Sequence, residues 1–323
     1  MKRRGFIMLV VPFLLCLGLG CEPSGDGRAD TNVFEQLQQK TLTKKIAATS
    51  YPLAAMAESI AGEAYEVWTP ARADKVPTAD EMRKLQSSDV LLINGPGTAY
   101  ATWLPMVTLD KQKIFETTTN SFELADFIRV QEHQIVHSHG GEGEHSHAWM
   151  VPHCWLSPRL ALLQAEAIRD KLCELYPEDA DSFRANYDEL IEVPLQEAVV
   201  GAAECKEAMK NMNASVVLSD PRLKHLAKAV DLDAESLLWF EPEEVEAAKE
   251  QLQELETDGK QWLLWARPPG PTETELIKGL KWSQVDLIES RLAEKSFAQR
   301  VKENFKRLSD GIEMATEVDV TDE

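Results

Sequence analysis

Short apolar runs alternate with helical stretches in the first half of this chain, and the alternation restricts the possible folds more than any other feature. Strand-like runs occupy residues 44–50, 65–69, 89–94 and 113–117, with helical patterns at 53–61 and 79–86. Parallel strands that are buried on both faces have this composition, and helices connect them. We therefore expect a parallel-sheet α/β sandwich.

The same alternation returns in the second half. Strand-like runs occupy residues 215–218, 262–266 and 284–288, with helical patterns at 222–230, 242–255, 272–280 and 291–313. Between the halves, residues 158–175 and 179–209 are predicted to be long helices, and only Pro194 interrupts the second. A helix of about 30 residues is about 45 Å long, which exceeds the needs of one lobe. The predicted fold is α/β, with two parallel-sheet sandwiches joined by one long helix.

These patterns also predict the domain boundaries. We expect a signal peptide, a lipid-anchored linker, an N-terminal lobe, a lobe-linking helix and a C-terminal lobe at residues 1–20, 21–43, 44–178, 179–210 and 211–323. The N-terminal lobe includes a histidine-rich loop at residues 133–148.

The first 20 residues have the features of a secretory signal. Basic residues at 2–4 precede an apolar run at 6–19, which is short compared with the ~20 residues of a membrane-spanning helix. Cys21 follows small residues, as the acylated cysteine of a bacterial lipoprotein does, although Leu17 lies four residues before it instead of three. An ordinary cleavage near Gly20 is the alternative. The prediction is an exported protein held by a lipid on the extracytoplasmic side of a membrane.

Charge and motifs exclude several classes of function. Acidic residues outnumber basic ones by 54 to 34, whereas nucleic-acid binding requires cations to neutralise phosphates. The sequence contains no nucleophile elbow, no glycine-rich phosphate loop, no His-Glu-x-x-His and no Cys-x-x-Cys. We therefore expect neither an enzyme nor a nucleic-acid partner.

Histidine is concentrated in one segment. Six of the seven histidines lie between His133 and His153. Four of them form two His-x-His pairs around an acidic, glycine-rich spacer, namely His137, His139, His145 and His147. Neutral imidazole is a good zinc ligand, and short histidine-rich tracts bind metals. The sequence predicts metal binding by these four residues; a solvated polar loop without a ligand is the alternative.

His153 lies in a different context, the sequence Val-Pro-His-Cys-Trp-Leu-Ser-Pro at residues 151–158. This segment resembles the Asp-Pro-His-Val-Trp-Leu-Asp-Pro motif of the zinc and manganese substrate-binding proteins of ABC importers. In the zinc-specific members of that family a histidine-rich loop often precedes this motif, as it does here. The resemblance also includes the glycines after Asn94, the helix after Pro158, the rigid lobe-linking helix and the Ser-Asp-Pro sequence at residues 219–221. The resemblance extends over residues 44–315. It implies a monomeric two-lobe receptor with a metal cleft between the lobes, and a membrane permease as partner.

The chain departs from this family at several ligand positions. The first family histidine has no counterpart in residues 73–79, and Asp220 stands where the third is expected. Asp286 corresponds to a carboxylate at the end of the last strand, and Arg267 replaces a glutamate of some members. Asp220 could instead cap a helix, Asp286 could be a surface turn residue, and Arg267 could repel a cation or pair with Asp286.

The resemblance and these departures together lead to one hypothesis for the site. One divalent ion binds His153, Asp220 and Asp286, with help from His145 or His147. Histidine ligation favours zinc, whereas two carboxylates favour a harder ion such as manganese. The expected function is delivery of zinc to an ABC importer. The alternative is a lipid-anchored metal buffer or adhesion protein with a degenerate cleft.

Deleting residues 137–147 tests the histidine-rich loop separately from the cleft. We expect the deleted chain to bind fewer zinc ions and to transfer zinc less efficiently, because all four paired imidazoles are removed. Equilibrium dialysis against zinc, followed by a transfer assay to the partner, measures both effects. Unchanged affinity and transfer would mean that the loop is only a spacer.

Overall fold

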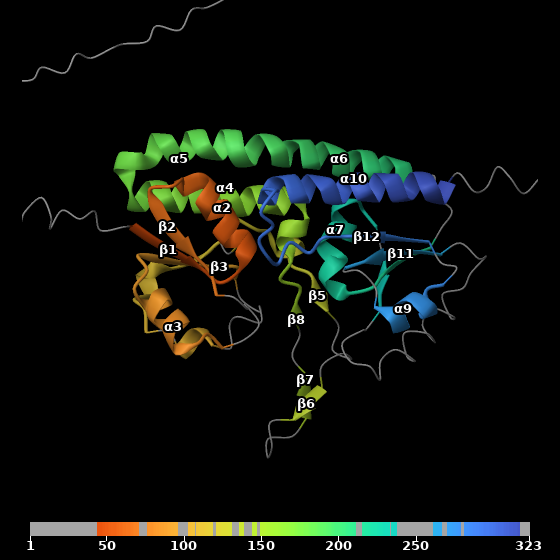
Figure 1. Cartoon of the computed structure of the whole chain (residues 1–323), viewed down its shortest axis with the longest axis horizontal. Helices are drawn as coiled ribbons and strands as arrows, with labels where there is room; N and C mark the ends of the chain where they lie inside the picture. The colour runs from red at the N-terminus through yellow and green to blue at the C-terminus, as the bar shows by residue number, and fades with distance from the viewer. Residues whose placement is uncertain are drawn as a thin grey trace, which may run out of the picture. The chain divides into compact units, whose positions relative to one another are not determined.

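A four-stranded parallel sheet forms the centre of the N-terminal lobe in this computed structural model (Figure 1). Its strands, in the order β2-β1-β3-β4, are β1 (Lys44–Ala48), β2 (Tyr65–Trp68), β3 (Val90–Ile93) and β4 (Ile114–Glu116). The connecting helices are α2 (Tyr51–Ala61) and α3 (Ala79–Gln86). All four residues of β3 are buried, which explains why the strand consists of aliphatic residues only.

The C-terminal lobe repeats this topology. Its parallel strands, in the order β10-β9-β11-β12, are β9 (Ser215–Leu218), β10 (Glu235–Ser236), β11 (Gln261–Trp265) and β12 (Lys281–Gln284). In the described part of this lobe, the α-helices are α7 (Lys224–Ala229), α9 (Pro271–Leu276) and α10 (Phe297–Thr316). In each sheet the first strand lies between the second and the third. The predicted fold of two parallel-sheet α/β lobes is confirmed.

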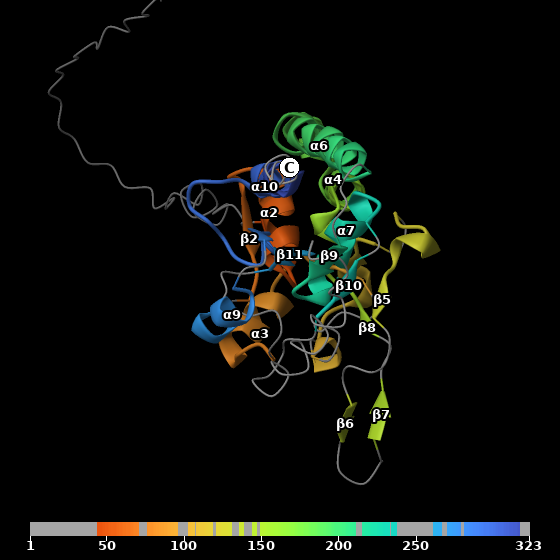
Figure 2. The same cartoon turned by 90° about the vertical axis from the view of Figure 1, so that its right-hand side faces the viewer.

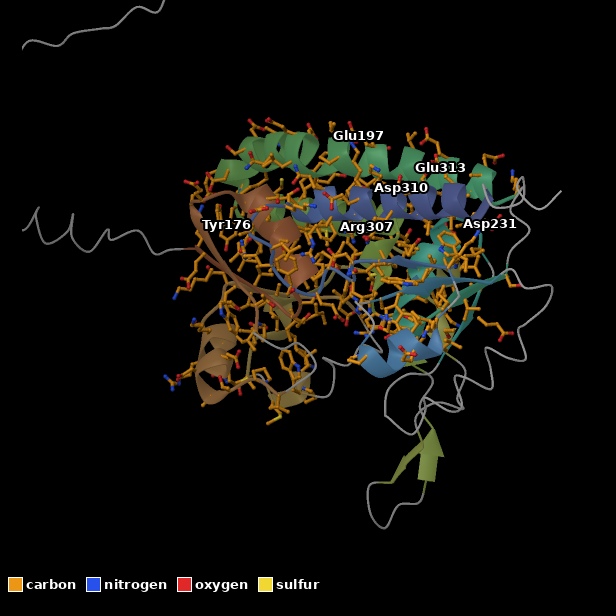
Figure 3. All side chains as sticks on the ribbon, turned by 45° about the vertical axis from the view of Figure 1, so that its right-hand side comes forward. Tyr176, Glu197, Asp231, Arg307, Asp310 and Glu313 are labelled. Atoms are coloured by element: carbon orange, nitrogen blue, oxygen red, sulfur yellow. The ribbon has the colours of Figure 1, made fainter. Side chains whose placement is uncertain are left out.

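Long helices run along both sheets. These are α4 (Pro158–Leu175), α5 (Ala180–Tyr187) and α6 (Val193–Met209). Helix α5 packs on α2 and α4, and α6 packs on α4 and α10. Figure 2 shows α6 beside α4 and α10. The Lys302 ammonium of α10 lies 2.6 Å from the Glu197 carboxylate of α6, which is labelled in Figure 3. No helix in the described part of the chain is both long and apolar enough to cross a bilayer.

The predicted linking helix is helical along its whole length, but it contains a π-helical turn at Asp188–Glu192. Pro194 has no N–H, so the carbonyl of Leu190 lacks its normal donor four residues later. The helix is wider in the turn just before the proline. There the Val193 N–H donates to the carbonyl of Asp188, five residues earlier, as in a π-helix. The helix thus accommodates the proline without ending.

The structure describes the chain in segments. They are residues 44–70, 76–95, 103–106, 108–118, 121–130, 136–138, 144–146, 149–210, 215–232, 234–237, 261–266, 270–278 and 281–316. The predicted signal peptide, the linker with Cys21, the helix at 242–255 and Arg267 lie outside these residues. The predicted domain boundaries stay predictions.

The strand predicted at residues 284–288 is wrong. Strand β12 ends at Gln284, and a loop runs from residue 285 to Ser296 before α10 begins. Ile288 has a φ of 59°, which no strand accommodates. Ser296 explains the late start of the helix, because its hydroxyl accepts from the Gln299 N–H while the Gln299 side chain accepts from the Ser296 N–H.

Substitutions at two glycines test how closely α10 packs against its neighbours. A Cβ at Gly311 would overlap the Ser283 hydroxyl and the Trp262 ring, whereas a Cβ at Gly201 of α6 would lie 3.5 Å from the Phe305 Cβ, an ordinary contact. We expect Gly311→Ala to destabilise the protein by about 1–3 kcal/mol through overpacking. The matched control Gly201→Ala should stabilise it by about 0.5–1 kcal/mol, because alanine favours helix. Urea denaturation measures both; equal stabilisation by the two substitutions would contradict the packing.

Candidate metal centre

The segment at residues 151–157, which leads into α4, is buried along its whole length. A polar network on the N-terminal lobe holds it. The Asn94 amide donates to the carbonyl of Pro152 at 2.6 Å. The Gln164 amide donates to the Asn94 side-chain oxygen at 2.6 Å and to the Thr117 hydroxyl at 2.9 Å. These buried polar groups form their hydrogen bonds with one another, and this network fixes the position of the backbone just before His153.

Cys154 faces this network. Its sulfur lies 3.3 Å from the side-chain oxygens of both Asn94 and Gln164. Burial raises the pKa of the Cys154 thiol to about 12. Both oxygens that the sulfur contacts belong to the buried network of the N-terminal lobe, so Cys154 is a core residue.

On the C-terminal lobe, the loop after β12 is organised around Asp286. Its carboxylate accepts from the Arg300 guanidinium at 2.6 and 2.8 Å and from the Ile288 N–H at 2.9 Å. The Asn304 side chain bonds to both backbone groups of Asp286. Burial would raise the pKa of Asp286, but the hydrogen bond and charge of Arg300 keep it below its ordinary value. Asp286 thus braces the loop.

His153 meets this loop at Glu289. Its Nε2 lies 2.8 Å from Glu289 Oε1, and its side chain is only 4% exposed whereas that of Glu289 is 48% exposed. The neighbouring Trp155 Nε1–H donates to the carbonyl of Leu287 at 2.9 Å. Nδ1 of His153 has no hydrogen-bond partner among the described residues. Two bonds therefore join the histidine segment to the loop.

Arg222 continues the network toward Asp220. Its Nη1 lies 3.1 Å from Glu289 Oε1, and its Nε and Nη2 donate to Asp220 Oδ2 at 2.8 and 2.6 Å. Asp220 Oδ1 accepts from the Arg222 backbone N–H, which is the helix-capping role foreseen as its alternative. Burial would raise the pKa of Glu289, but His153 and Arg222 lower it.

The predicted ligands are therefore only partly brought together. His153 and Asp220 are connected through Glu289 and Arg222, while Asp286 faces Arg300. In the described part of the chain, no three His, Cys, Asp or Glu side chains already surround a point where an ion could sit. The sequence reasoning missed Glu289, which lies in a loop that was predicted to be strand and helix.

A cavity of about 570 Å³ lies beside this network. Its lining includes both carboxylates of the loop and three arginines, namely Asp286, Glu289, Arg222, Arg300 and Arg307. Arg307 projects from α10 and is labelled in Figure 3. The cavity offers space for a charged side chain to move.

The histidine-rich loop contains a short hairpin. Strands β6 (Val136–Ser138) and β7 (Glu144–Ser146) pair antiparallel, with His137 directly opposite His145 (Figure 1). Outside it, β5 (Arg129–Val130) pairs with β8 (Trp149–Met150). His139 and His147 lie outside the described residues. The hairpin places one histidine of each predicted pair in the same register, and metal binding by the loop stays a prediction.

His225, the seventh histidine, was assigned no role from the sequence. It is 2% exposed, and its Nε2–H donates to the carbonyl of Val151 at 3.0 Å. Burial lowers the pKa of His225 to about 4, so the ring is neutral at pH 7. Helix α7 thus holds the beginning of the His153 segment through an uncharged imidazole.

Comparison with known families gives one match over most of the described chain. Residues 46–262 match the family described as zinc-uptake complex component A, periplasmic.

Two curated relatives have names that describe metal-binding lipoproteins. The zinc-binding lipoprotein AdcA of Streptococcus pneumoniae is 30% identical over 154 residues, which are 46% of this chain and 30% of AdcA. The metal ABC transporter substrate-binding lipoprotein SsaB of Streptococcus sanguinis is 20% identical over 265 residues, 79% of this chain and 77% of SsaB. The chain thus aligns with less than a third of AdcA.

Solved structures share the fold. Zn(II)-bound AdcA from Streptococcus pneumoniae superposes with a TM-score of 0.62 at 21% identity, over 84% of this chain and 58% of AdcA. The Cd-bound periplasmic metal binding protein of Candidatus Liberibacter asiaticus gives a TM-score of 0.60 at 17% identity, over 84% of this chain and all of that one. At these identities the likeness concerns the fold alone.

The buried His225 gives a testable pH dependence. Its pKa of about 4 in the folded chain lies below the ordinary value of 6.5, so below pH 6.5 the unfolded chain binds a proton that the folded chain does not. Stability therefore falls as the pH decreases from 6.5 to 4, by up to about 3 kcal/mol from this group. His225→Gln keeps a donor for Val151 and should lose this part of the slope. Urea denaturation at pH 7, 5.5 and 4.5 compares the two chains; parallel pH profiles would contradict the assignment.

Proposed function

Because this chain belongs to the family of the periplasmic component A of the zinc-uptake complex, we propose that it is an extracytoplasmic receptor that delivers zinc to an ABC importer. The family consists of transport components, not enzymes. The names of the relatives support the proposal, since one is a zinc-binding lipoprotein and another a substrate-binding lipoprotein of a metal ABC transporter.

The contact between His153 and Glu289 is the observation that carries the proposal. It brings a buried imidazole from one lobe to within 2.8 Å of a carboxylate from the other. Imidazole nitrogen and carboxylate oxygen are the ligands that zinc takes in proteins. We propose that zinc binds at this contact, with His153 and Asp220 as ligands and a third ligand from the loop at residues 285–290. Asp286 is the residue of that loop chosen from the sequence.

Zinc is proposed over manganese for two reasons. The matching family is named for zinc uptake, and the relative AdcA is named a zinc-binding lipoprotein. The histidine-rich loop supplies additional nitrogen donors at His137, His139, His145 and His147, which would gather zinc near the cleft. A site of one histidine and two carboxylates also suits manganese, so both ions belong in the binding assay.

The helix that joins the lobes constrains how the ion is released. Helices α5 and α6 are continuous through the π turn and pack on elements of both lobes. A hinge in this helix would break that packing. We therefore propose that release occurs through side-chain and loop rearrangement at the cleft, together with small shifts of the lobes.

The proposed location follows from the N-terminal sequence. The signal peptide at residues 1–20 would export the chain, and a lipid on Cys21 would hold it at the extracytoplasmic face of the membrane. A linker at residues 21–43 would let a monomeric receptor reach the permease, which is the proposed partner.

Replacing His153 tests the metal centre. We expect His153→Ala to weaken the tight zinc site about 100-fold or more, because a neutral imidazole ligand is lost. Equilibrium dialysis against zinc and manganese measures affinity and stoichiometry. Cys205→Ala is the control: it removes a buried thiol that contacts the carbonyl of Phe305 and no residue of the centre, and it should leave zinc binding intact.

Unchanged affinity and stoichiometry in His153→Ala would rule out the centre. Zinc bound only by the histidine-rich loop would then favour a metal buffer.

A further inference from the structure

Arg222 lies between the carboxylates of Asp220 and Glu289. Its guanidinium donates to Asp220 Oδ2 through two nitrogens and to Glu289 Oε1 through a third. The same Glu289 oxygen lies 2.8 Å from His153 Nε2. One positive group is therefore held by the donor atoms that a divalent ion would need, and its charge prevents an ion from binding beside it.

The two arginines of the centre differ in how firmly they are held. The Arg300 side chain is 3% exposed and donates to Asp286 through two nitrogens and to the Ser290 carbonyl through the third. Removing it from Asp286 would leave a buried charge without a partner. The Arg222 side chain is 34% exposed and borders the cavity of about 570 Å³. Arg222 thus has space and solvent into which it can move.

These contacts distinguish the two candidate carboxylates of the loop. Asp286 is held by Arg300, by the Ile288 N–H and by Asn304, so its oxygens already have partners. Glu289 is 48% exposed and already contacts His153. When Arg222 leaves, the carboxylates of Glu289 and Asp220 lose this cation, and Glu289 still contacts the imidazole of His153.

We propose that the Arg222 side chain competes with the metal ion for the same site. In the metal-free protein its guanidinium occupies the position of the cation. When the Arg222 side chain moves into the cavity, Glu289, and not Asp286, becomes the loop ligand. This inference rests on the proposed function and adds its regulation. The ion must displace a tethered cation to bind, and the return of that cation helps to release the ion. Arg222 therefore lowers the affinity of the centre.

The test uses the full chain and zinc titrations against a competing chelator, so that only tight binding is scored. Arg222→Met removes the competing charge and should tighten zinc binding about tenfold or more. Glu289→Gln should weaken it at least tenfold. Lys224→Met and Glu294→Gln are the matched controls, since they make the same changes of charge nearby and should have no effect.

Nuclear magnetic resonance of the arginine Nε–H groups gives a second readout on the unaltered protein. Adding zinc should shift the Arg222 Nε–H signal, because its bond to Asp220 breaks, and leave the Arg300 signal in place. An unmoved Arg222 signal at saturating zinc would overturn the inference.

The outcomes separate the inference from the proposed function. If the wild type binds zinc tightly but both Arg222→Met and Glu289→Gln behave as their controls do, the competitor role is wrong and the receptor function stands. Loss of zinc in a folded Asp286→Asn, with Glu289→Gln unaffected, would also overturn the inference. If neither the wild type nor any variant binds zinc, the receptor function fails as well.

Discussion

The burial of residues 151–157 is the constraint on which the rest of the centre depends. A buried backbone segment must have partners for its polar groups, because each unpaired group costs about 1–3 kcal/mol. Asn94 satisfies the carbonyl of Pro152, His225 satisfies that of Val151, and the Trp155 indole is satisfied by Leu287. These partners come from both lobes. His153 is therefore aimed at the loop after β12 by the hydrogen bonds of its neighbours.

Burial also explains why the carboxylates of the centre are paired with arginines. A carboxylate withdrawn from water requires a cation or several donors. Asp286 has Arg300, and Asp220 has Arg222, which it shares with Glu289. Sequence comparison treats Asp220 and Asp286 alike, as carboxylates at expected positions. The structure separates them by the exposure of their arginine partners, and that difference is the basis of the exchange that we propose between a guanidinium and a metal ion.

Sequence patterns predicted correctly those helices and strands whose ends are determined by neighbouring residues. The bounds of α3, α4 and β9 agree with the predicted ranges, because caps and apolar periodicity act within a few residues. The loop after β12 was predicted wrongly. Its conformation depends on hydrogen bonds to Asp286 from Arg300 and Asn304, which lie in the following helix α10. His153 could be found from its motif. Its contact partner Glu289 lies 136 residues away in the sequence, and a local sequence pattern does not predict a contact over that separation.

The proposed receptor has to bind its ion and also release it, and the linking helix makes wide opening of the lobes costly. The helix packs along both lobes, so moving them apart would expose apolar surface at about 25 cal/mol for each Å². Moving one half-exposed arginine exposes little apolar surface and restores two ion pairs when it returns. For the receptor that we propose, an exchange between a guanidinium and a metal ion is therefore the less costly way to release the ion.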